Sequence, residues 1–344
     1  MIDTNNYFVL YTNCMLVKGH VRSTICDLQH ERYKLIPNEL FEILSDNQKN
    51  EFTLNALFNK YSEDSEGLKL YVDLLIEEGF GFYTDLEPHT FFPPLNTKYE
   101  YFGKVSNAII DYNNKYDHKL LNSFVQHLSL NSCEAVQMRF YSPVSISTLE
   151  EIFKYFLTTD ITCIELLLPS TDLDEQITKL ALEHLRIGSI AFHGSKEKTE
   201  ELIQQGYRKL IVKKVTQKID SCEACGVINP AYFNVNVSTF TEAISFNSCL
   251  NGKIAVDENG YIKNCPSMSG NFGNIQNKYD FVETIESNEF TQYWAINKDK
   301  IQECKSCEFR YICQDCRAYT KMEGDILSKP LKCNYNPLSG LYAN

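Results

Sequence analysis

Cysteine is the residue type that most constrains this chain, because its 13 copies are unevenly spread over the 344 residues. The first two thirds of the sequence hold Cys14, Cys26, Cys133 and Cys163. The others all follow residue 220: Cys222, Cys225, Cys249, Cys265, Cys304, Cys307, Cys313, Cys316 and Cys333. Closely spaced thiolates can reach one metal centre and suit zinc or iron–sulfur clusters. We therefore predict metal ligation in the C-terminal third.

Several features predict a protein of a reducing compartment. No run approaches 18 apolar residues, and the stretch 1–6 lacks the basic region and cleavage site of a secretory signal. We expect a cytoplasmic chain without a membrane partner, whose clustered cysteines bind metal rather than form disulfides. The formal net charge of −12 also argues against a nucleic-acid partner, since phosphates favour a basic surface.

The first 86 residues predict a winged-helix-like unit. Strands are expected over 7–11 and 23–28, paired as a hairpin whose turn includes Lys18-Gly19-His20. Helices are expected over 36–44, over 53–60 with Thr53 as N-cap, and over 66–79, where Gly79 ends the helix. A short strand over 80–83 closes the unit, and residues 87–100 form a Pro-rich linker.

Residues 101–220 predict an α/β fold in which strands and helices alternate. The expected strands are 107–112, 135–140, 163–168, 189–193 and 209–214, and the expected helices are 119–128, 147–157, 173–185 and 198–205. This order indicates a parallel sheet, and five strands favour an open, partial β/α barrel over a closed one. In residues 221–344 the regular pattern stops, apart from a hairpin turn at Asn259-Gly260 and a helix over 285–296 that holds Trp294.

The spacing of the later cysteines resembles the SPASM domain, a C-terminal extension of many radical SAM peptide-modifying enzymes. The residues that match its order are Cys249, Gly260, Cys265, Cys304, Cys307, Cys313, Cys316 and Cys333. One departure is that two residues, rather than three, separate Cys313 from Cys316.

The resemblance implies two auxiliary [4Fe–4S] clusters. One would be held by Cys304, Cys307, Cys313 and Cys333, and the other by Cys249, Cys265 and Cys316. Cys225, which precedes Gly226, is our candidate for the missing fourth ligand. Cys222 as that ligand, an open iron site, and zinc in place of the clusters stay open as alternatives.

A radical SAM enzyme also needs Cys-x3-Cys-x2-Cys after the first barrel strand, so that one iron of its cluster stays free to bind SAM. Here the segment that follows the predicted strand, 113–118, contains no cysteine. We therefore expect a degenerate barrel and no SAM cleavage by this chain. The four earlier cysteines are expected to be small buried hydrophobic residues.

The segments 247–254, 262–267 and 307–318 resemble the SPASM-domain peptide maturase of grasp-with-spasm systems. The resemblance implies a role beside an ATP-grasp ligase that crosslinks a ribosomally made precursor peptide. The N-terminal unit resembles the recognition element of such pathways, which binds a leader peptide as an added strand. An ordinary winged-helix packing module is the alternative for this unit. For the whole chain, a redox enzyme that uses its clusters and a zinc-bound interaction module also stay open.

Other candidate residues are few. His193 at a predicted strand end is a possible acid or base, and Asp111 and His118 are possible remnants of a pocket. Two arginines, Arg310 and Arg317, are expected to donate to cluster sulfurs or to pair with the acids Glu308 and Asp315. The alternative for these two acids is that they are simply exposed. Neither a Gly-rich phosphate loop nor a nucleophile elbow occurs, so the sequence predicts no ATP site and leaves the catalytic residues unknown.

Overall fold

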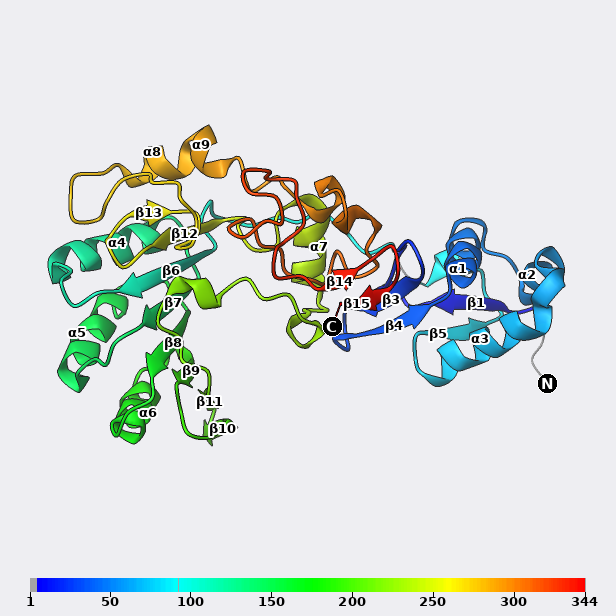
Figure 1. Cartoon of the computed structure of the whole chain (residues 1–344). Helices are drawn as coiled ribbons and strands as arrows, with labels where there is room; N and C mark the ends of the chain where they lie inside the picture. Colours follow the sequence, from blue (N-terminus) through cyan, green and yellow to red (C-terminus); the bar gives the residue numbers. More distant parts are fainter. Residues whose placement is uncertain (1–4, 92, 344) are drawn as a thin grey trace.

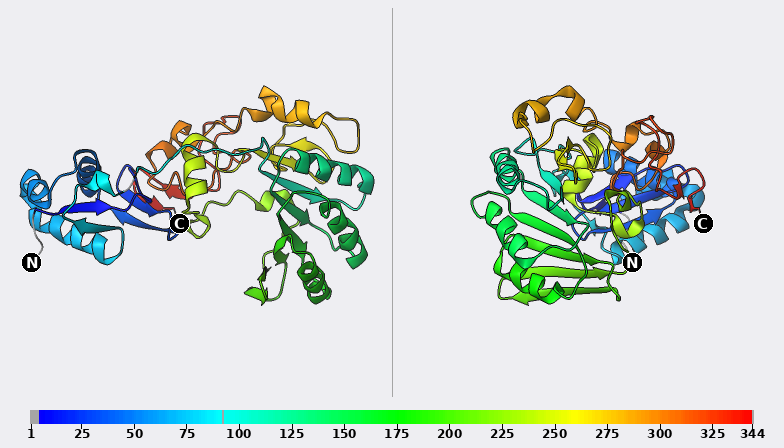
Figure 2. Two further views of the ribbon diagram at one scale, coloured as in Figure 1. Left: turned by 180° about the vertical axis from the view of Figure 1, so that it is seen from behind. Right: turned by 60° about the vertical axis from the view of Figure 1, so that its left-hand side comes forward.

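The computed structural model describes residues 5–91 and 93–343. Most of the 1–6 stretch, for which the sequence predicts no secretory signal, and residue 92 of the predicted linker lie outside these ranges. The chain forms an N-terminal unit, a large sheet with helices, and a C-terminal segment of mostly irregular loops (Figure 1). The last part of this segment, coloured orange-red to red, lies between the large sheet and the N-terminal unit, as Figure 1 and the left view of Figure 2 both show. Among the described residues, no helix combines the length and apolar content needed to span a membrane.

The N-terminal unit contains short strands and helices. Its strands are β1 (Tyr7–Leu10), β2 (Cys14–Val17), β3 (Ser23–Asp27), β4 (Arg32–Ile36) and β5 (Gly81–Thr84). Its helices are α1 (Asn38–Asn50), α2 (Leu54–Lys60) and α3 (Ser65–Glu77). The predicted helices are confirmed, and the Thr53 side chain caps α2 by accepting a hydrogen bond from the Ala56 N–H.

The predicted pairing of the first two strands is wrong. β1 pairs with β5, whereas β3 lies between β2 and β4, two strands that the sequence did not predict. All residues of β3 are buried, which suits the central position in a sheet. Strand partners follow from burial of both faces in the folded unit, and local propensity does not contain that information.

The large sheet has the strand order β10-β11-β9-β8-β7-β6-β12-β13. Its strands are β6 (Asn107–Tyr112), β7 (Ala135–Phe140), β8 (Cys163–Pro169), β9 (Ile187–His193), β10 (Thr199–Gln205), β11 (Arg208–Val215), β12 (Lys253–Val256) and β13 (Ile262–Lys263). The connecting helices are α4 (His118–Leu130), α5 (Ile146–Phe156) and α6 (Asp174–Glu183). From β11 to β12 the neighbouring strands run parallel, so the expected alternation of strands and helices on a parallel sheet is confirmed.

Two predicted helices are wrong. Residues 198–205 form mostly β10, which pairs antiparallel with β11 from Thr199↔Lys214 to Gln205↔Arg208. Glu and Gln favour a helix, but the tight turn at Gly206 (φ +60) folds this segment back onto β11. The expected helix 285–296 is instead α8 (Phe281–Glu286) and α9 (Asn288–Thr291), and Ser287 separates them by capping α9. Trp294 lies beyond both.

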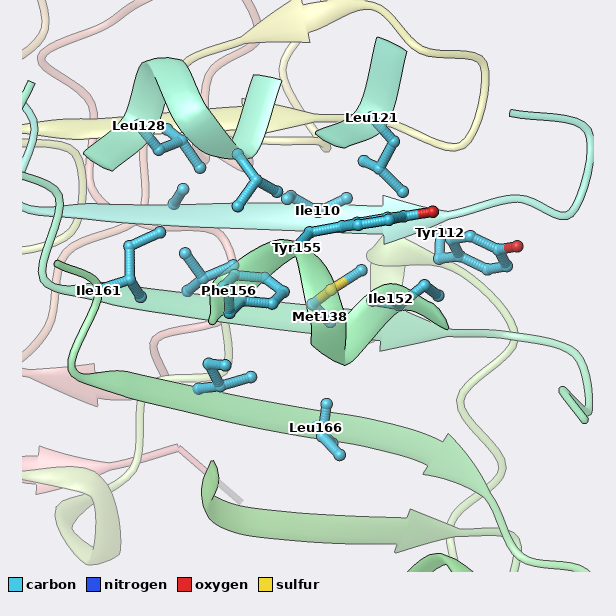
Figure 3. Close-up of a cluster of buried hydrophobic side chains, with 14 of the residues drawn as sticks. Ile110, Tyr112, Leu121, Leu128, Met138, Ile152, Tyr155, Phe156, Ile161 and Leu166 are labelled. Carbon is cyan, nitrogen blue, oxygen red and sulfur yellow. The ribbon is translucent and has the colours of Figure 1, made fainter. Parts of the chain in front are cut away.

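The main core lies between the sheet and its helices. Figure 3 shows Ile110 and Met138 of adjacent strands facing Leu121 and Leu128 of α4 and Ile152 of α5. Apolar residues at helical spacing put one face of α4 against the sheet. Among the early cysteines, Cys14, Cys26 and Cys133 are buried as expected, and Cys163 is half-buried.

The sheet extends beyond residue 220, where the sequence placed a domain boundary. β12 runs parallel to β6 from Lys253↔Asn107 to Val256↔Ile110, and β13 follows it through the predicted turn, where Gly260 has φ +83. The rest of the C-terminal segment includes α7 (Val237–Ser245), β14 (Tyr335–Asn336) and β15 (Leu341–Tyr342). The β12–β13 hairpin therefore carries Cys249 and Cys265, which flank it, to one edge of the sheet.

Candidate metal centres

Four predicted ligands line one small cavity in the C-terminal segment. Cys225, Cys249, Cys265 and Cys316, here called the first cysteine group, surround a volume of about 50 Å³. A cavity that accommodates a single buried water needs a volume of roughly 10–15 Å³, so this cavity has room for more than one atom. The tertiary fold thus brings together thiols from four separate stretches of sequence.

The dipeptide Cys225-Gly226 is fitted to this cavity. Gly226 has φ +86, and a Cβ placed on it would lie 2.9 Å from the Cys316 sulfur. Glycine is therefore required both by the backbone and by the sulfur. Cys222 is not among the residues that line the cavity, and its carbonyl accepts a hydrogen bond from Ser267 Oγ at 3.1 Å.

The second cysteine group comprises Cys304, Cys307, Cys313 and Cys333. A 3₁₀ turn, Cys304–Ser306, carries the first thiol, and the N–H of Cys307 donates to the carbonyl of Cys304 at 2.9 Å. The N–H of Cys313 donates to the carbonyl of Phe309 at 3.0 Å, while Cys333 forms an isolated parallel bridge with Ile228. Burial raises the pKa of Cys304 to about 12, and Cys313 and Cys333 are close enough to add to that rise. These contacts place the four residues in one neighbourhood.

A lysine that the sequence analysis missed accompanies each group. The Nζ of Lys253 lies 3.5 Å from the Cys249 sulfur. Lys298 is only 4% exposed, and its Nζ donates to the Gln314 carbonyl at 2.7 Å and lies 3.7 Å from an Asp315 carboxylate oxygen. Burial opposes the charge of both lysines, yet neighbouring cysteines and, for Lys298, Asp315 raise each lysine's pKa. A cation beside several thiols stabilises their thiolate forms.

The first cavity is lined by four sulfur atoms, the donor type that thiolate-bound metal requires. Burial raises the pKa of Cys265 to about 12, so this thiol stays protonated unless a nearby cation offsets the cost. Coordination to a metal deprotonates a thiol outright, and sets of four thiolates hold iron–sulfur clusters or zinc. Within residues 5–91 and 93–343, no three Cys, His, Asp or Glu side chains converge as the ligands of one metal ion.

The two arginines have protein partners. Arg317 donates to Asp315 Oδ1 at 2.7 Å, as one of the predicted pairs requires. Arg310 donates to Asp299 Oδ1 at 2.8 Å, so its predicted pairing with Glu308 is wrong. The expectation that Glu308 and Asp315 are exposed is also wrong, because both are buried. Glu308 accepts instead from Arg22 of the N-terminal unit at 2.8 Å.

His193 supports the fold of the large sheet. Its Nδ1 accepts the Ile219 N–H at 3.2 Å, so its Nε2 carries the proton and donates to the Phe140 carbonyl at 3.2 Å. Burial lowers the pKa of His193. The neutral imidazole thus joins the chain after β11 to the end of β7, and both of its nitrogens are engaged.

Asp111 and His118 have separate internal partners. Asp111 forms a buried bidentate pair with Arg139, its neighbour in the β6–β7 register, at 2.5 and 2.9 Å. The ring of His118 contacts the hydroxyl of Tyr155 and lies 3.4 Å from the Glu151 carboxylate. Both side chains are therefore engaged by partners within the fold.

The N-terminal unit contains a groove of about 700 Å³. Leu16 of β2, Phe41 and Lys49 of α1, and Pro94 of the linker are among its lining residues. β2 is an edge strand of its sheet. An edge strand beside a partly apolar groove has the form that an extended peptide needs for strand addition.

No family model and no curated protein matches the chain. Among solved structures, it is similar to one described as the crystal structure of Streptococcus suis SuiB bound to S-adenosylmethionine. The identity is 11%, the TM-score is 0.36, and the alignment covers 96% of this chain and 98% of that chain.

Proposed function

We propose that this chain is a cytoplasmic iron–sulfur protein of peptide maturation. The observation that carries the proposal is the cavity lined by Cys225, Cys249, Cys265 and Cys316. Four thiols around a space larger than one atom suit a [4Fe–4S] cluster, and the second cysteine group would hold another. Such clusters, when bound, supply one-electron transfer.

The chain's own residues would protect and balance these centres. Cys225 would complete the first set of four thiolates, which favours a structural or electron-transfer role over substrate binding at an open iron. Lys253 and Lys298 would offset part of the negative charge of the thiolates. Leu250, which is 2% exposed, lies beside the cavity and would help to exclude water.

The N-terminal groove would bind the leader segment of a ribosomally made precursor peptide. The support is the edge strand β2, the adjoining groove and the resemblance of the unit to a leader-recognition element. Side chains of an added strand alternate between its two faces, so every second residue of the leader would contact Leu16 and Phe41. The partnership with an ATP-grasp ligase rests on the resemblance of the later segments alone.

SAM cleavage is not part of the proposal. The segment between β6 and α4, residues 113–117, supplies no cysteine for a SAM-binding cluster. The chain would therefore act by presenting the peptide and by holding its two clusters. Formation of 5′-deoxyadenosine from SAM by the reduced, purified chain would contradict this part.

Metal analysis tests the iron–sulfur assignment. The full chain is purified without oxygen, and iron, acid-labile sulfide and zinc are measured per chain. We expect about eight irons and eight sulfides, as two cubane clusters require. About two zinc ions with little sulfide would replace the redox assignment with a zinc-bound interaction module.

Peptide binding is tested separately. Candidate precursors are the short open reading frames beside the gene, made as fluorescein-labelled peptides and titrated by anisotropy. Phe41→Ala is expected to weaken binding roughly fivefold or more, since truncation of a central aromatic contact costs more than about 1 kcal/mol. Phe58→Ala is the matched control, because Phe58 packs on the same core as Phe41 but is not among the groove residues. Absence of binding at micromolar concentrations would contradict the leader-binding proposal.

A further inference from the structure

The N-terminal unit contacts the loop that carries three members of the second cysteine group. From the β2–β3 hairpin, the His20 N–H donates to the Ser306 carbonyl and Thr24 Oγ1 donates to the Glu308 carbonyl, both at 2.9 Å. In return the Arg310 guanidinium donates to the Lys18 carbonyl. The loop residues in these contacts lie between Cys304 and Cys313 in the sequence.

Apolar packing joins the same two segments. Val17, Cys26 and Leu28 share a buried cluster with Phe309 and Cys313. Two more members of the second cysteine group, Cys307 and Cys333, pack against that cluster. Predicted metal ligands are therefore part of the interface itself.

Glu308 makes the contact between the N-terminal unit and the 304–313 loop depend on the conformation of that loop. Its side chain is 1% exposed, and Arg22 Nε donates to its carboxylate at 2.8 Å. Tyr335 also donates to the same carboxylate. A buried carboxylate that loses its partners is costly, so the interface requires the loop to present Glu308 in one position.

The loop has little regular structure of its own. Between Cys304 and Cys313 it contains one 3₁₀ turn, Cys304–Ser306, and a few turn hydrogen bonds. Metal ligation by several residues of a short loop fixes its conformation, and the binding energy then contributes to folding.

We propose that metal bound by the second cysteine group controls the docking of the N-terminal unit on the rest of the chain. With metal present, the 304–313 loop is held in the shape that receives the β2–β3 hairpin; when the metal is lost, the hairpin is released. The inference rests on the proposed function in assigning metal to these thiols. Because β2 also lines the peptide groove, the metal content of the second cysteine group would determine how tightly the groove is held against the rest of the chain.

Hydrogen exchange on the full chain tests the coupling. The metal-loaded protein is compared with the same protein after anaerobic chelation, and iron, sulfide and zinc are measured on both samples. Amides in residues 14–27 are expected to exchange roughly tenfold faster after metal removal, which is the scale of losing one hydrogen bond to a charged group. Exchange over α2 and α3 is expected to stay unchanged, which shows that the unit itself remains folded.

Arg22→Gln separates docking from metal binding. This variant is expected to keep its iron and to show the faster exchange over 14–27 even when loaded, so that chelation adds little further change. Lys305→Ala is the matched control, since Lys305 lies in the same loop with an exposed side chain, and it is expected to behave as the parent does. Unchanged exchange over 14–27 after verified metal loss would overturn the coupling while the proposed function stands. A reconstituted chain that holds neither iron nor zinc would overturn both.

Discussion

Gly226 lies directly against Cys316: a Cβ on the glycine would be 2.9 Å from the sulfur. The two residues are far apart in the sequence, and their contact forms one wall of the cavity of the first cysteine group. The position of the Cys316 sulfur therefore depends on the absence of a side chain at residue 226.

Substitution of Gly226 by Ala is expected to halve the iron and sulfide content, from about eight of each to about four. The added methyl group displaces the Cys316 sulfur and prevents assembly of the first cluster, whereas the second cluster still assembles. Gly324→Ala is the matched control, because Gly324 has a similar φ of +78 but no atom within 4 Å of the added Cβ. Equal iron contents in the two variants would show that the sulfur contact does not matter.

Cys225 and Cys222 differ in their relation to the first cavity, which predicts different effects of serine at the two positions. Cys225→Ser is expected to lower iron content or to change the electron paramagnetic resonance spectrum of the reduced protein, because a ligand is lost. Cys222→Ser is expected to leave both unchanged. The opposite result would assign the fourth ligand to Cys222.

Lys298→Met is expected to lower the iron retained by the second cysteine group, toward about four irons per chain. Burial works against the charge of this ammonium, and its closeness to Cys313, Asp315 and Cys304 raises its pKa all the same. Removal of the charge leaves the thiolates uncompensated. Lys300→Met provides the control, since Lys300 is exposed. Full iron content with an unaltered reduction potential would exclude this role for Lys298.

The Asp111–Arg139 pair between β6 and β7 predicts a stability effect in the large sheet. Asp111→Asn is expected to destabilise the protein by about 3–5 kcal/mol, because the Arg139 charge stays buried without its partner. Urea unfolding followed by circular dichroism measures the change. The double variant Asp111→Leu with Arg139→Met is expected to regain most of the loss, whereas a pair without structural importance would give no loss in the single variant.

His193 predicts a dependence of stability on pH. Burial lowers its folded-state pKa below the ordinary value near 6.5, so the unfolded chain binds the proton more tightly. Its stabilising contribution is therefore complete above about pH 6.5 and is lost as the pH falls through the folded pKa. His193→Asn is expected to show a smaller loss of unfolding free energy between about pH 7 and pH 5. An identical pH profile in the parent and the variant would contradict this account.

Local sequence signals predicted the elements whose own residues decide their structure. The strands over 107–112 and 135–140 have the predicted bounds, because each places buried apolar residues at every second position and lies between polar turns. The segment 198–205 fails for the opposite reason, since its Glu and Gln residues favour a helix while its partner β11 imposes a strand.

The sequence by itself determined the supply of thiols and the short spacing of Cys304, Cys307 and Cys313, since a few residues of chain limit how far such side chains can separate. Only the tertiary structure decided that Cys225 lines the first cavity, that Lys298 lies among the second thiols, and that Arg22 meets Glu308 across 286 residues. Contacts of that separation depend on the burial of whole surfaces against one another. That burial is a property of the folded chain, and no local spacing in the sequence reports it.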